Sequence, residues 1–273
     1  MKQLRAIRIL LAVIFLAASV ACIAIGPHFN PIAAVAGKVQ IALSALSITI
    51  GATFVWLLVS LLFGRVYCAT VCPVGTLSDL FLRLRRRIPC LNRPFSYRPQ
   101  SRASIHILWV YLICLLVGIG VIPLLIEPWN ITRNIVGIFR PSVAQQAWIE
   151  VGLGAATGIV AGVVSLILIA ALSLWRGREF CTSYCPIGYA MGKIGGKSLY
   201  RLEIDRDLCD SCGLCEDECR ASCIKVVSRY IDNTRCVRCL DCAARCPRRA
   251  IRFQIGRNRP AAPLFRRKTR SEV

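Results

Sequence analysis

Residues 209–219 read CDSCGLCEDEC, and residues 236–247 read CVRCLDCAARCP. Both stretches carry four cysteines in one pattern, C-x2-C-x2-C-x3-C, and the second is followed by proline. Three cysteines at this spacing place three sulfur atoms on a single loop, and the fourth lies one turn further along. Two copies of such a loop predict two similar metal-binding sites in this part of the chain.

The chemistry that best matches the spacing is a pair of [4Fe-4S] cubes with crossed ligands. Three thiolates can bind three irons of one cube, while the fourth cysteine of each copy reaches the other cube. Cluster 1 would be held by Cys209, Cys212, Cys215 and Cys246, and cluster 2 by Cys236, Cys239, Cys242 and Cys219. Zinc is one alternative, but its sites prefer paired cysteines separated by a longer loop. Disulfides are the other, and they need an oxidising compartment.

Two residues next to the first motif depart from the simplest pattern. Arg220 stands where a proline commonly follows the fourth cysteine. Because that proline supports the turn and binds no iron, the ligand assignment is unchanged. Cys223 is a ninth cysteine in this region, and we expect it to be a small buried side chain and not a ligand.

The composition predicts a membrane protein. The 273 residues are 56% hydrophobic, yet the formal net charge is +21, and the mean hydropathy is +0.58. Four stretches without Asp, Glu, Lys or Arg cover residues 9–37, 39–64, 103–126 and 151–175. Each provides the roughly 20 apolar residues that a transmembrane helix needs. We therefore expect transmembrane helices at about residues 7–25, 40–63, 104–126 and 149–175.

The distribution of basic residues predicts the orientation. Only Lys38, Arg133 and Arg140 fall in the loops after the first and third helices. Because cytoplasmic loops are rich in Lys and Arg, both termini and the cysteine-rich module are expected in the cytoplasm of a bacterium, below its inner membrane. Cysteine thiolates and clusters persist in that reducing compartment. Anionic lipid headgroups reward the same charge, so membrane lipid is an expected partner and nucleic acid is not.

An internal repeat follows the second and fourth predicted helices. Residues 64–75 read GRVYCATVCPVG and residues 177–188 read GREFCTSYCPIG, an offset of 113 residues. Each half of the membrane domain is therefore two helices and one C-x3-C-P turn, and the two halves run in parallel. The predicted architecture is an α-helical four-helix bundle (residues 1–192), a small α+β module of the bacterial two-cluster ferredoxin type (residues 193–256) and a basic tail (residues 257–273).

The two turns bring four further cysteines to the same membrane surface. If they converge, Cys68, Cys72, Cys181 and Cys185 could hold a third iron-sulfur cluster. The first alternative is that they are small buried side chains that pack the helices. The second is a redox-active dithiol in each half. Spacing alone does not decide among these three.

A quinone site and a haem are the other cofactor sites that a membrane electron carrier suggests. Glu127 and Trp129, in an expected outer loop, and His28 are weak candidates to bind quinone or quinol. A site near His106, Tyr67 and Tyr184 on the inner face is the alternative. Haem is not expected, because the two histidines of the chain would lie on opposite faces of the membrane.

The chain resembles the NapH/MauN ferredoxin-type membrane proteins, the family of quinol dehydrogenase membrane components. The resemblance rests on the two C-x3-C-P turns after the second and fourth of four helices, and on the two-cluster segment that follows them. It covers nearly the whole chain, from the first helix to about Phe253. It implies that electrons pass from quinol through the named clusters to a partner redox protein of ferredoxin or cytochrome c type.

Two functions are consistent with these features. The first is an electron-transfer subunit between the quinone pool and a partner oxidoreductase. The second is an accessory reductase that delivers cytosolic electrons to a metal or cofactor during its assembly.

Charges around the motifs add one expectation, because Glu216, Asp217 and Glu218 lie in the first motif and arginines surround the second. Positive charge favours the reduced form, so cluster 2 should have the higher potential. The arginines are Arg238, Arg245, Arg248 and Arg249.

Overall fold

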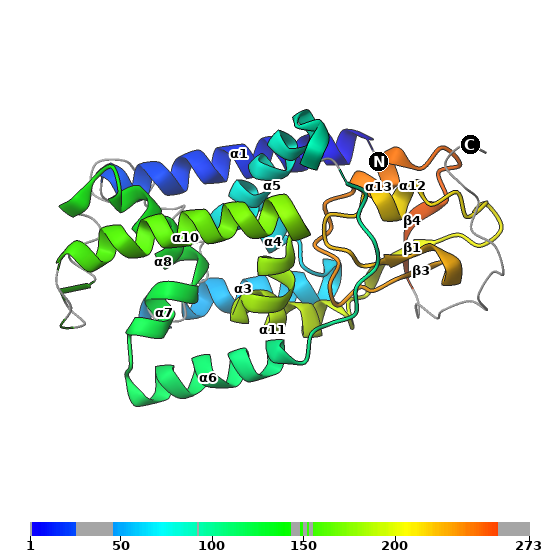
Figure 1. The fold of residues 1–273 in the computed structure, drawn as a ribbon. Helices are drawn as coiled ribbons and strands as arrows, with labels where there is room; N and C mark the ends of the chain where they lie inside the picture. Colours follow the sequence, from blue (N-terminus) through cyan, green and yellow to red (C-terminus); the bar gives the residue numbers. More distant parts are fainter. Residues whose placement is uncertain are drawn as a thin grey trace.

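A computed structural model describes residues 2–25, 46–91, 93–142, 148–149, 152 and 155–255. The molecule has a helical half and a smaller module, which lies at one end of the long helices (Figure 1). His28, the start of the second predicted span and the basic tail lie outside the described residues.

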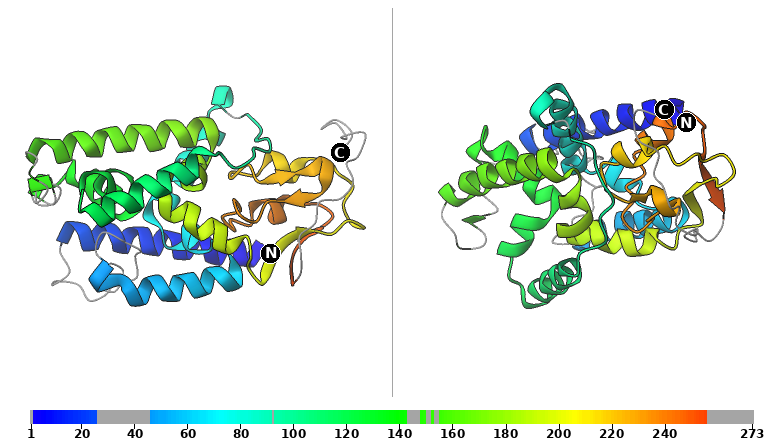
Figure 2. Two further views of the ribbon diagram at one scale, coloured as in Figure 1. Left: turned by 90° about the horizontal axis from the view of Figure 1, so that it is seen from below. Right: turned by 45° about the vertical axis from the view of Figure 1, so that its right-hand side comes forward.

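Four apolar helices form the helical half and lie roughly along one direction, as the views of Figures 1 and 2 agree. They are α1 (Lys2–Ile25), α3 (Leu46–Phe63), α6 (Ala103–Val117) and α10 (Ala155–Arg176). Two of the described helices, over residues 3–24 and 156–176, are long and apolar enough to cross a membrane. Residues 53–63 and 103–117 form shorter apolar helices. The first and fourth predicted spans thus coincide with helices of membrane length, and the four-span topology stays a prediction.

The third predicted span, residues 104–126, is not one helix. α6 ends at Val117, and Gly118 adopts a left-handed conformation with φ of 82°. The chain then forms α7 (Val121–Ile126) and α8 (Pro128–Gly137). Glycine reaches this conformation without the steric cost that a side chain brings, so it ends the helix inside an uncharged stretch that hydropathy reads as continuous.

α8 packs back into the bundle, against α10. A side chain at Gly162 of α10 would collide with the carbonyl oxygen of Asn134 and touch Ile138. Asn134 also donates to the Leu124 carbonyl at 3.0 Å, which ties α8 to α7. The segment expected to be an outer loop is thus helical and largely buried.

Shorter helices connect the long ones to the module. α4 (Tyr67–Thr70), α5 (Pro73–Arg87) and η2 (Pro89–Leu91) follow α3. A π-helical turn, η3 (Phe180–Tyr184), and α11 (Pro186–Gly195) follow α10.

The module contains two small antiparallel sheets and short helices. β1 (Tyr200–Ile204) pairs with β4 (Ile251–Ile255), and β2 (Ile224–Lys225) pairs with β3 (Tyr230–Ile231). The remaining elements are α12 (Leu214–Asp217), η4 (Val226–Ser228) and α13 (Asp241–Arg245). Leu202 and Ile204 alternate with more exposed neighbours on β1, as expected for a strand with one buried face.

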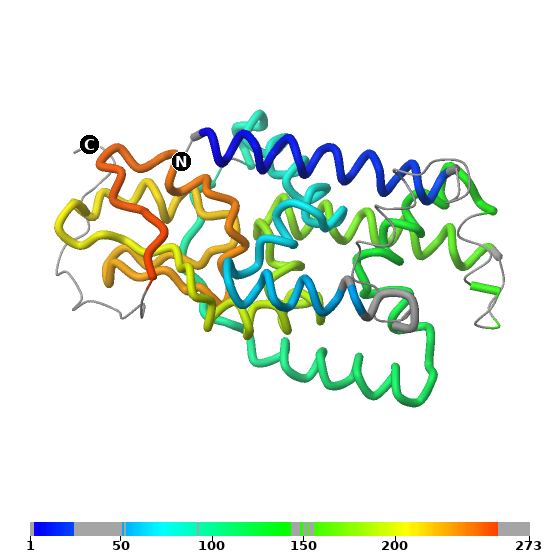
Figure 3. Tube along the Cα trace, turned by 180° about the vertical axis from the view of Figure 1, so that it is seen from behind, coloured from blue at the N-terminus to red at the C-terminus, as the bar shows by residue number. Residues whose placement is uncertain are grey.

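One continuous core joins the two halves of the molecule. The cluster of buried side chains that contains Cys68 and Cys181 of the helical half also contains Leu202 and Ile231 of the module. An extended strap, residues 93–100, lies along the module (Figure 3). The Phe95 amide donates to the Asp217 carbonyl at 3.2 Å, and the Arg98 amide to the Ser222 carbonyl at 3.0 Å. The cysteine loops are therefore held against the helical half and do not hang from a free linker.

Candidate metal centres

The two repeated turns begin where α3 and α10 end. Gly64 and Gly177 follow these helices with φ of 77° and 75°. A left-handed residue just past a helix satisfies the last carbonyl groups and redirects the chain, and only glycine adopts it cheaply. A side chain at Gly177 would also meet the Arg220 carbonyl. The glycine that opens each repeat therefore sets the angle at which the cysteine turn leaves the helix.

The second cysteine of each turn caps the helix that follows. Pro73 and Pro186 occupy the first positions of α5 and α11, where the missing N–H costs nothing. The Gly188 amide donates to the Cys185 sulfur at 3.3 Å, whereas Cys72 occupies the same N-cap position of α5 without a side-chain cap hydrogen bond. The sequence C-P-x-G thus begins a helix in both turns, and in the second turn the cap is a sulfur atom.

Each arginine of the repeat reaches across to the other repeat. The Arg178 guanidinium donates to the Cys68 carbonyl at 2.9 Å and to the Gly75 carbonyl at 3.0 Å. Arg65 donates to the Cys181 carbonyl and lies 4.0 Å from the Cys68 sulfur. These contacts are reciprocal and clamp the two turns together.

The clamp brings the four cysteines of the turns into one buried group. Each of Cys68, Cys72, Cys181 and Cys185 is at most 5% exposed. Cys72 is within electrostatic range of the other three sulfur atoms. Burial and the neighbouring thiols raise the pKa values of Cys72 and Cys185. Burial raises the pKa of Cys181 to about 11, although Arg178 opposes the shift.

This donor set fits an anionic iron-sulfur cube. Four thiolates around iron carry net negative charge, and Arg65 is a fully buried cation at their edge. No carboxylate of the described residues forms an ion pair with Arg65, and its Nε has no hydrogen-bond partner there. Buried charge without compensation is costly, so an anionic group beside Arg65 would balance it.

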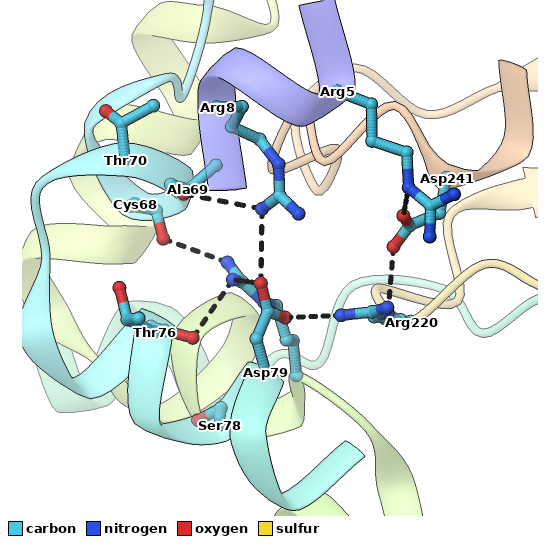
Figure 4. Close-up of polar contacts among 12 residues, drawn as sticks. Arg5, Arg8, Cys68, Ala69, Thr70, Thr76, Ser78, Asp79, Arg220 and Asp241 are labelled. Carbon is cyan, nitrogen blue, oxygen red and sulfur yellow. Dashed lines mark hydrogen bonds and ion pairs between the residues drawn. The ribbon is translucent and has the colours of Figure 1, made fainter. Parts of the chain in front are cut away.

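Arg178, by contrast, is neutralised by Asp79 of α5. Its Nη2 lies 2.7 Å from the carboxylate, and its Nε donates to the other oxygen at 2.9 Å. Arg8 of α1 and Arg220 of the module bind the same carboxylate at 3.1 and 2.9 Å (Figure 4). Burial alone would raise the pKa of Asp79, but the three arginines outweigh it and hold that pKa well below its usual value.

A second carboxylate extends this network into the module. Arg220 also binds Asp241 at 2.8 Å, and Arg5 of α1 binds Asp241 at 2.7 Å (Figure 4). Asp241 lies between Cys239 and Cys242 in sequence, and Arg220 follows Cys219. The arginine that replaces the usual proline is therefore an ion-pair partner that fastens the loops of cluster 2 to the helical half.

The four cysteines assigned to cluster 1 surround one small cavity of about 20 Å³. Cys209, Cys212, Cys215 and Cys246 all line it. Burial, followed by the charges of the other three thiols, raises the pKa of Cys215. The structure thus brings Cys246 of the second motif to the three clustered cysteines of the first.

The cysteines assigned to cluster 2 are likewise brought together. Cys242 is within electrostatic range of Cys239, Cys219 and Cys236, and Cys239 is within range of Cys219. All four are buried. Cys223 lies among them, with its sulfur 3.4 Å from that of Cys219. A hydrogen bond from Cys223, assisted by Arg238 and opposed by burial, lowers the pKa of Cys236 to about 6.

The loops of the two motifs share a backbone conformation. Positive φ occurs at the second and fourth residues after the first cysteine of each copy, and again three residues after the last. These positions are Ser211, Gly213 and Ser222 in the first copy, and Arg238, Leu240 and Arg249 in the second. Left-handed residues turn successive amides toward one concave side, an arrangement that suits an anionic cluster. Backbone amides of Leu214 and Arg238 form hydrogen bonds to the thiols of Cys212 and Cys236, as expected for loops that surround a cluster.

No group of three or more His, Cys, Asp or Glu side chains is placed to hold a single metal ion in the described residues. A cube has iron atoms between its ligands, so its sulfur atoms stand farther apart than those around one zinc ion. The preference for cubes over zinc rests on the spacing of the two C-x2-C-x2-C-x3-C motifs.

The charges around the two clusters are divided differently from the sequence expectation. Arg248 lies beside Asp210, at 3.7 Å, in the loop of cluster 1. The run from Arg245 to Arg249 flanks Cys246, which joins cluster 1 through the crossed pairing. Near cluster 2 the positive charge comes from buried arginines instead, because Arg238 and Arg65 both lower the pKa of Cys236.

The quinone candidates of the outer segment, Glu127, Trp129 and His28, do not share one environment. Glu127 is fully buried, and its carboxylate accepts hydrogen bonds from Tyr111 at 3.3 Å and Asn130 at 2.7 Å. Trp129 follows it on α8 and is partly exposed. His28 lies outside the described residues, so the structure does not place the three together.

The residues of the inner alternative are likewise divided. Tyr67 is buried and packs edge-on against Trp56 at 5.1 Å. Tyr184 is exposed, and His106 lies on α6. None of these three lines the cavities that are bordered by the strap, the cysteine loops and the end of β4.

Sequence reasoning missed Asp79, which connects both repeats and the module. One signal could have found it, because Asp79 is the only acidic residue among residues 1–126. A lone carboxylate in a basic, apolar stretch is expected to be paired, since an isolated buried charge is unstable. Its partners, however, come from residues 8, 178 and 220, which no local pattern connects.

Comparison with known families identifies iron-sulfur domains in both halves. A family described as a 4Fe-4S binding domain matches residues 44–90 and 159–201, and each segment contains one C-x3-C-P turn. A second 4Fe-4S binding domain family matches residues 229–252. The chain therefore carries iron-sulfur binding domains in the helical half as well as in the module.

Similar proteins include two ferredoxin-type proteins. The ferredoxin-type protein NapH of Haemophilus influenzae is 27% identical over 75% of this chain and 67% of its own length. The methylamine utilization ferredoxin-type protein MauN of Paracoccus denitrificans is 30% identical over 62% of this chain and 53% of its own length. An uncharacterized protein of Methanocaldococcus jannaschii is 25% identical over 71% of this chain and 74% of its own length. No solved structure matches. The resemblance indicated by the motifs is confirmed.

Proposed function

We propose that this chain, a homologue of the ferredoxin-type NapH and MauN proteins, is a membrane-bound electron carrier with three iron-sulfur sites in a row. It would pass electrons between the quinone pool and a partner oxidoreductase of ferredoxin or cytochrome c type. The homology and the two membrane-length helices indicate a membrane protein. The observation that carries the proposal is the reciprocal contact of Arg65 and Arg178 across the two cysteine turns.

The third site would be held by Cys68, Cys72, Cys181 and Cys185, the buried group that the two arginines clamp. When bound, a [4Fe-4S] cube supplies reversible one-electron transfer. The protein contributes ligands, amide hydrogen bonds to sulfur and buried positive charge. It also excludes water from the four thiols, which are almost fully buried.

The order of the sites follows from their neighbours. Arg65, at the sulfur of Cys68, is within electrostatic range of Cys236. Arg178, at the carbonyl of Cys68, is within range of Cys239. Cluster 2 would therefore lie between the membrane turns and cluster 1. Cluster 1 would be the exit to a partner, since three of its cysteines are partly exposed.

Iron quantitation tests the third site directly. Three cubes give about twelve irons per anaerobically purified chain, and two give about eight. The double variant Cys68→Ser, Cys181→Ser should lose about four irons and leave the ferredoxin-type EPR signals. Cys114→Ser is the matched control, because Cys114 is also buried but lies in α6, outside every motif. Wild-type protein with about eight irons would contradict the third site.

A separate measurement tests the electron source and the proposed location in the bacterial inner membrane, with the module in the cytoplasm. Quinol added to membranes that contain the protein should reduce the clusters. A protease applied from the cytoplasmic side should cleave the module. Clusters that respond to cytosolic reductants but never to quinol would instead favour the accessory reductase.

A further inference from the structure

A cavity of about 480 Å³ opens between the end of α10, the η2 turn and the strap. Its polar wall is formed by Arg85, Arg93, Arg98 and Arg176, and its apolar wall includes Leu91 and Trp175. Among the residues that the structure describes, no Asp or Glu lines it. Four guanidinium groups with no carboxylate in the same wall form a site for an anion, although Arg85 and Arg93 also border a second pocket that Asp217 and Glu218 line.

Arg85 is the most constrained of these four cations. It is only 4% exposed, and its Nε and Nη2 donate to the carbonyls of Leu91 and Arg93, each at 2.7 Å. Its guanidinium stacks over the Phe95 ring at 4.4 Å. Burial, with repulsion from Arg86 and Arg93, lowers the pKa of the Arg85 side chain. A nearby anion would act in the opposite direction.

One nitrogen of Arg85 remains unused. Its Nη1 is buried and has no hydrogen-bond partner among the described residues. A buried donor without a partner costs free energy, and two donors of the same guanidinium already fix its orientation. Solvent does not reach this nitrogen, so an anion in the cavity would compensate the charge of Arg85 without a direct hydrogen bond to it.

The location of the cavity indicates the kind of anion. It lies at the end of α10, where the membrane-length segment of residues 156–176 finishes. Trp175 is 76% exposed there, and exposed tryptophan at the end of such a helix is typical of the headgroup level of a bilayer. A molecule that satisfies both walls must carry an anionic group and an apolar part.

We propose that this cavity binds the phosphate of an anionic phospholipid of the membrane. Arg93, Arg98 and Arg176 bind the phosphate, the buried charge of Arg85 behind them adds to the attraction, and the acyl chains continue along Leu174 and Trp175. Because Arg98 in the same wall bonds to Ser222 of the module, the lipid stabilises the strap between the bilayer and the ferredoxin loops. The proposal rests on the membrane location of α10 and not on the clusters.

Native mass spectrometry of the full chain in detergent tests the proposal with phosphatidylglycerol and phosphatidylcholine. Phosphatidylglycerol should bind, and phosphatidylcholine should bind much more weakly. Arg85→Gln should weaken phosphatidylglycerol binding about tenfold, because it removes a buried positive charge beside the anion. Arg87→Gln is the matched control, since Arg87 is an exposed arginine of the same helix that does not line the cavity.

Arg176→Gln keeps the test valid if Arg85→Gln fails to fold, because Arg176 makes no hydrogen bond that the fold of η2 needs. It should also weaken binding, by a smaller factor. A parallel measurement with inorganic phosphate shows whether the cavity binds a lipid phosphate or free phosphate. Equal lipid binding by wild type and both cavity variants overturns the proposal. So does binding of free phosphate without binding of phosphatidylglycerol.

Discussion

The two cysteine turns share a backbone but differ in charge. In the second turn, Arg178 is neutralised by Asp79. The residue 113 positions after Asp79 is Gly192, so the corresponding carboxylate that would face Arg65 is absent. A side chain at Gly192 would collide with the Thr234 carbonyl of the module. The duplicated backbone thus sets where the sulfur atoms lie, and docking of the module on one half determines which arginine remains uncompensated.

This difference assigns separate tasks to the two arginines. Arg178 and Asp79 belong to a buried ion-pair network that holds α1, α5 and the module together. Arg65 places a positive charge beside the sulfur atoms. One half of the repeat therefore contributes mainly to assembly, and the other mainly to the electrostatics of the candidate third site.

The largest effect is expected from Asp79→Asn, which removes the neutralising half of the network. Three buried guanidinium groups lose their shared carboxylate, which should cost roughly 3 to 5 kcal/mol of stability. Thermal unfolding of the detergent-solubilised protein measures it. Arg248→Gln is the control, because Arg248 is exposed and its pair with the partly exposed Asp210 is worth at most about 1 kcal/mol.

The same network predicts how stability depends on pH. The pKa of Asp79 is lower in the folded protein than in the unfolded chain. Its contribution is therefore complete above the unfolded value of ~3.9 and is lost only as the pH falls through the lower folded value. The Asp79→Asn penalty should be constant between about pH 5 and 8. A penalty that changes with pH across this range would contradict the ion-pair assignment.

Substitution of Gly75 and Gly188, the glycines of the two C-P-x-G sequences, tests whether the two cysteine turns have equivalent backbones. A side chain at Gly75 or Gly188 would collide with the carbonyl of Cys68 or Cys181, the first cysteine of the same turn. Gly75→Ala and Gly188→Ala should each therefore displace the turn and remove about four irons. Gly51→Ala in α3 is the matched control, since no atom lies within 4 Å of the new methyl group. Iron loss in only one of the two variants would show that the turns are not equivalent.

Arg65→Gln should sharpen the electrostatic side of the comparison. Loss of an uncompensated positive charge disfavours the reduced cluster, so the midpoint potential of the third site should fall by on the order of 60 mV, or ~1.4 kcal/mol. Arg65→Lys keeps the positive charge, so the midpoint potential of the third site should stay close to the wild-type value. Arg178→Gln should shift it less, because Asp79 already offsets that charge. Redox titration followed by EPR provides the three values.

The smallest effect is expected between the two ferredoxin-type sites. Buried Arg238 and Arg65 act on Cys236, whereas the arginine nearest cluster 1, Arg248, is exposed and paired. Cluster 2 should therefore have the higher potential, by a margin smaller than the Arg65→Gln shift. A titration in which cluster 1 is reduced first would contradict this order.

The sequence alone indicated the cysteine loops, the repeated turns and the apolar helices, because spacing and hydropathy are local properties. The two copies of C-x2-C-x2-C-x3-C already implied crossed ligands, and the structure places Cys246 with the first loop and Cys219 with the second. Hydropathy did not reveal the break at Gly118, since a left-handed glycine leaves an apolar stretch unchanged in composition. It therefore assigned Glu127 to an outer loop, although the helices around it bury its carboxylate.

The charges show where the limit of sequence reasoning lies. Residue types and spacing determined which cysteines are available and that the turns are duplicated. Which cations face them was decided only by tertiary packing, because Arg8, Arg178 and Arg220 meet Asp79 from three distant segments. An ion pair has no preferred separation along the chain, so its partners are set by how helices and loops dock. For the same reason, only the folded chain shows that Arg65, beside the sulfur atoms, has no carboxylate partner among the described residues.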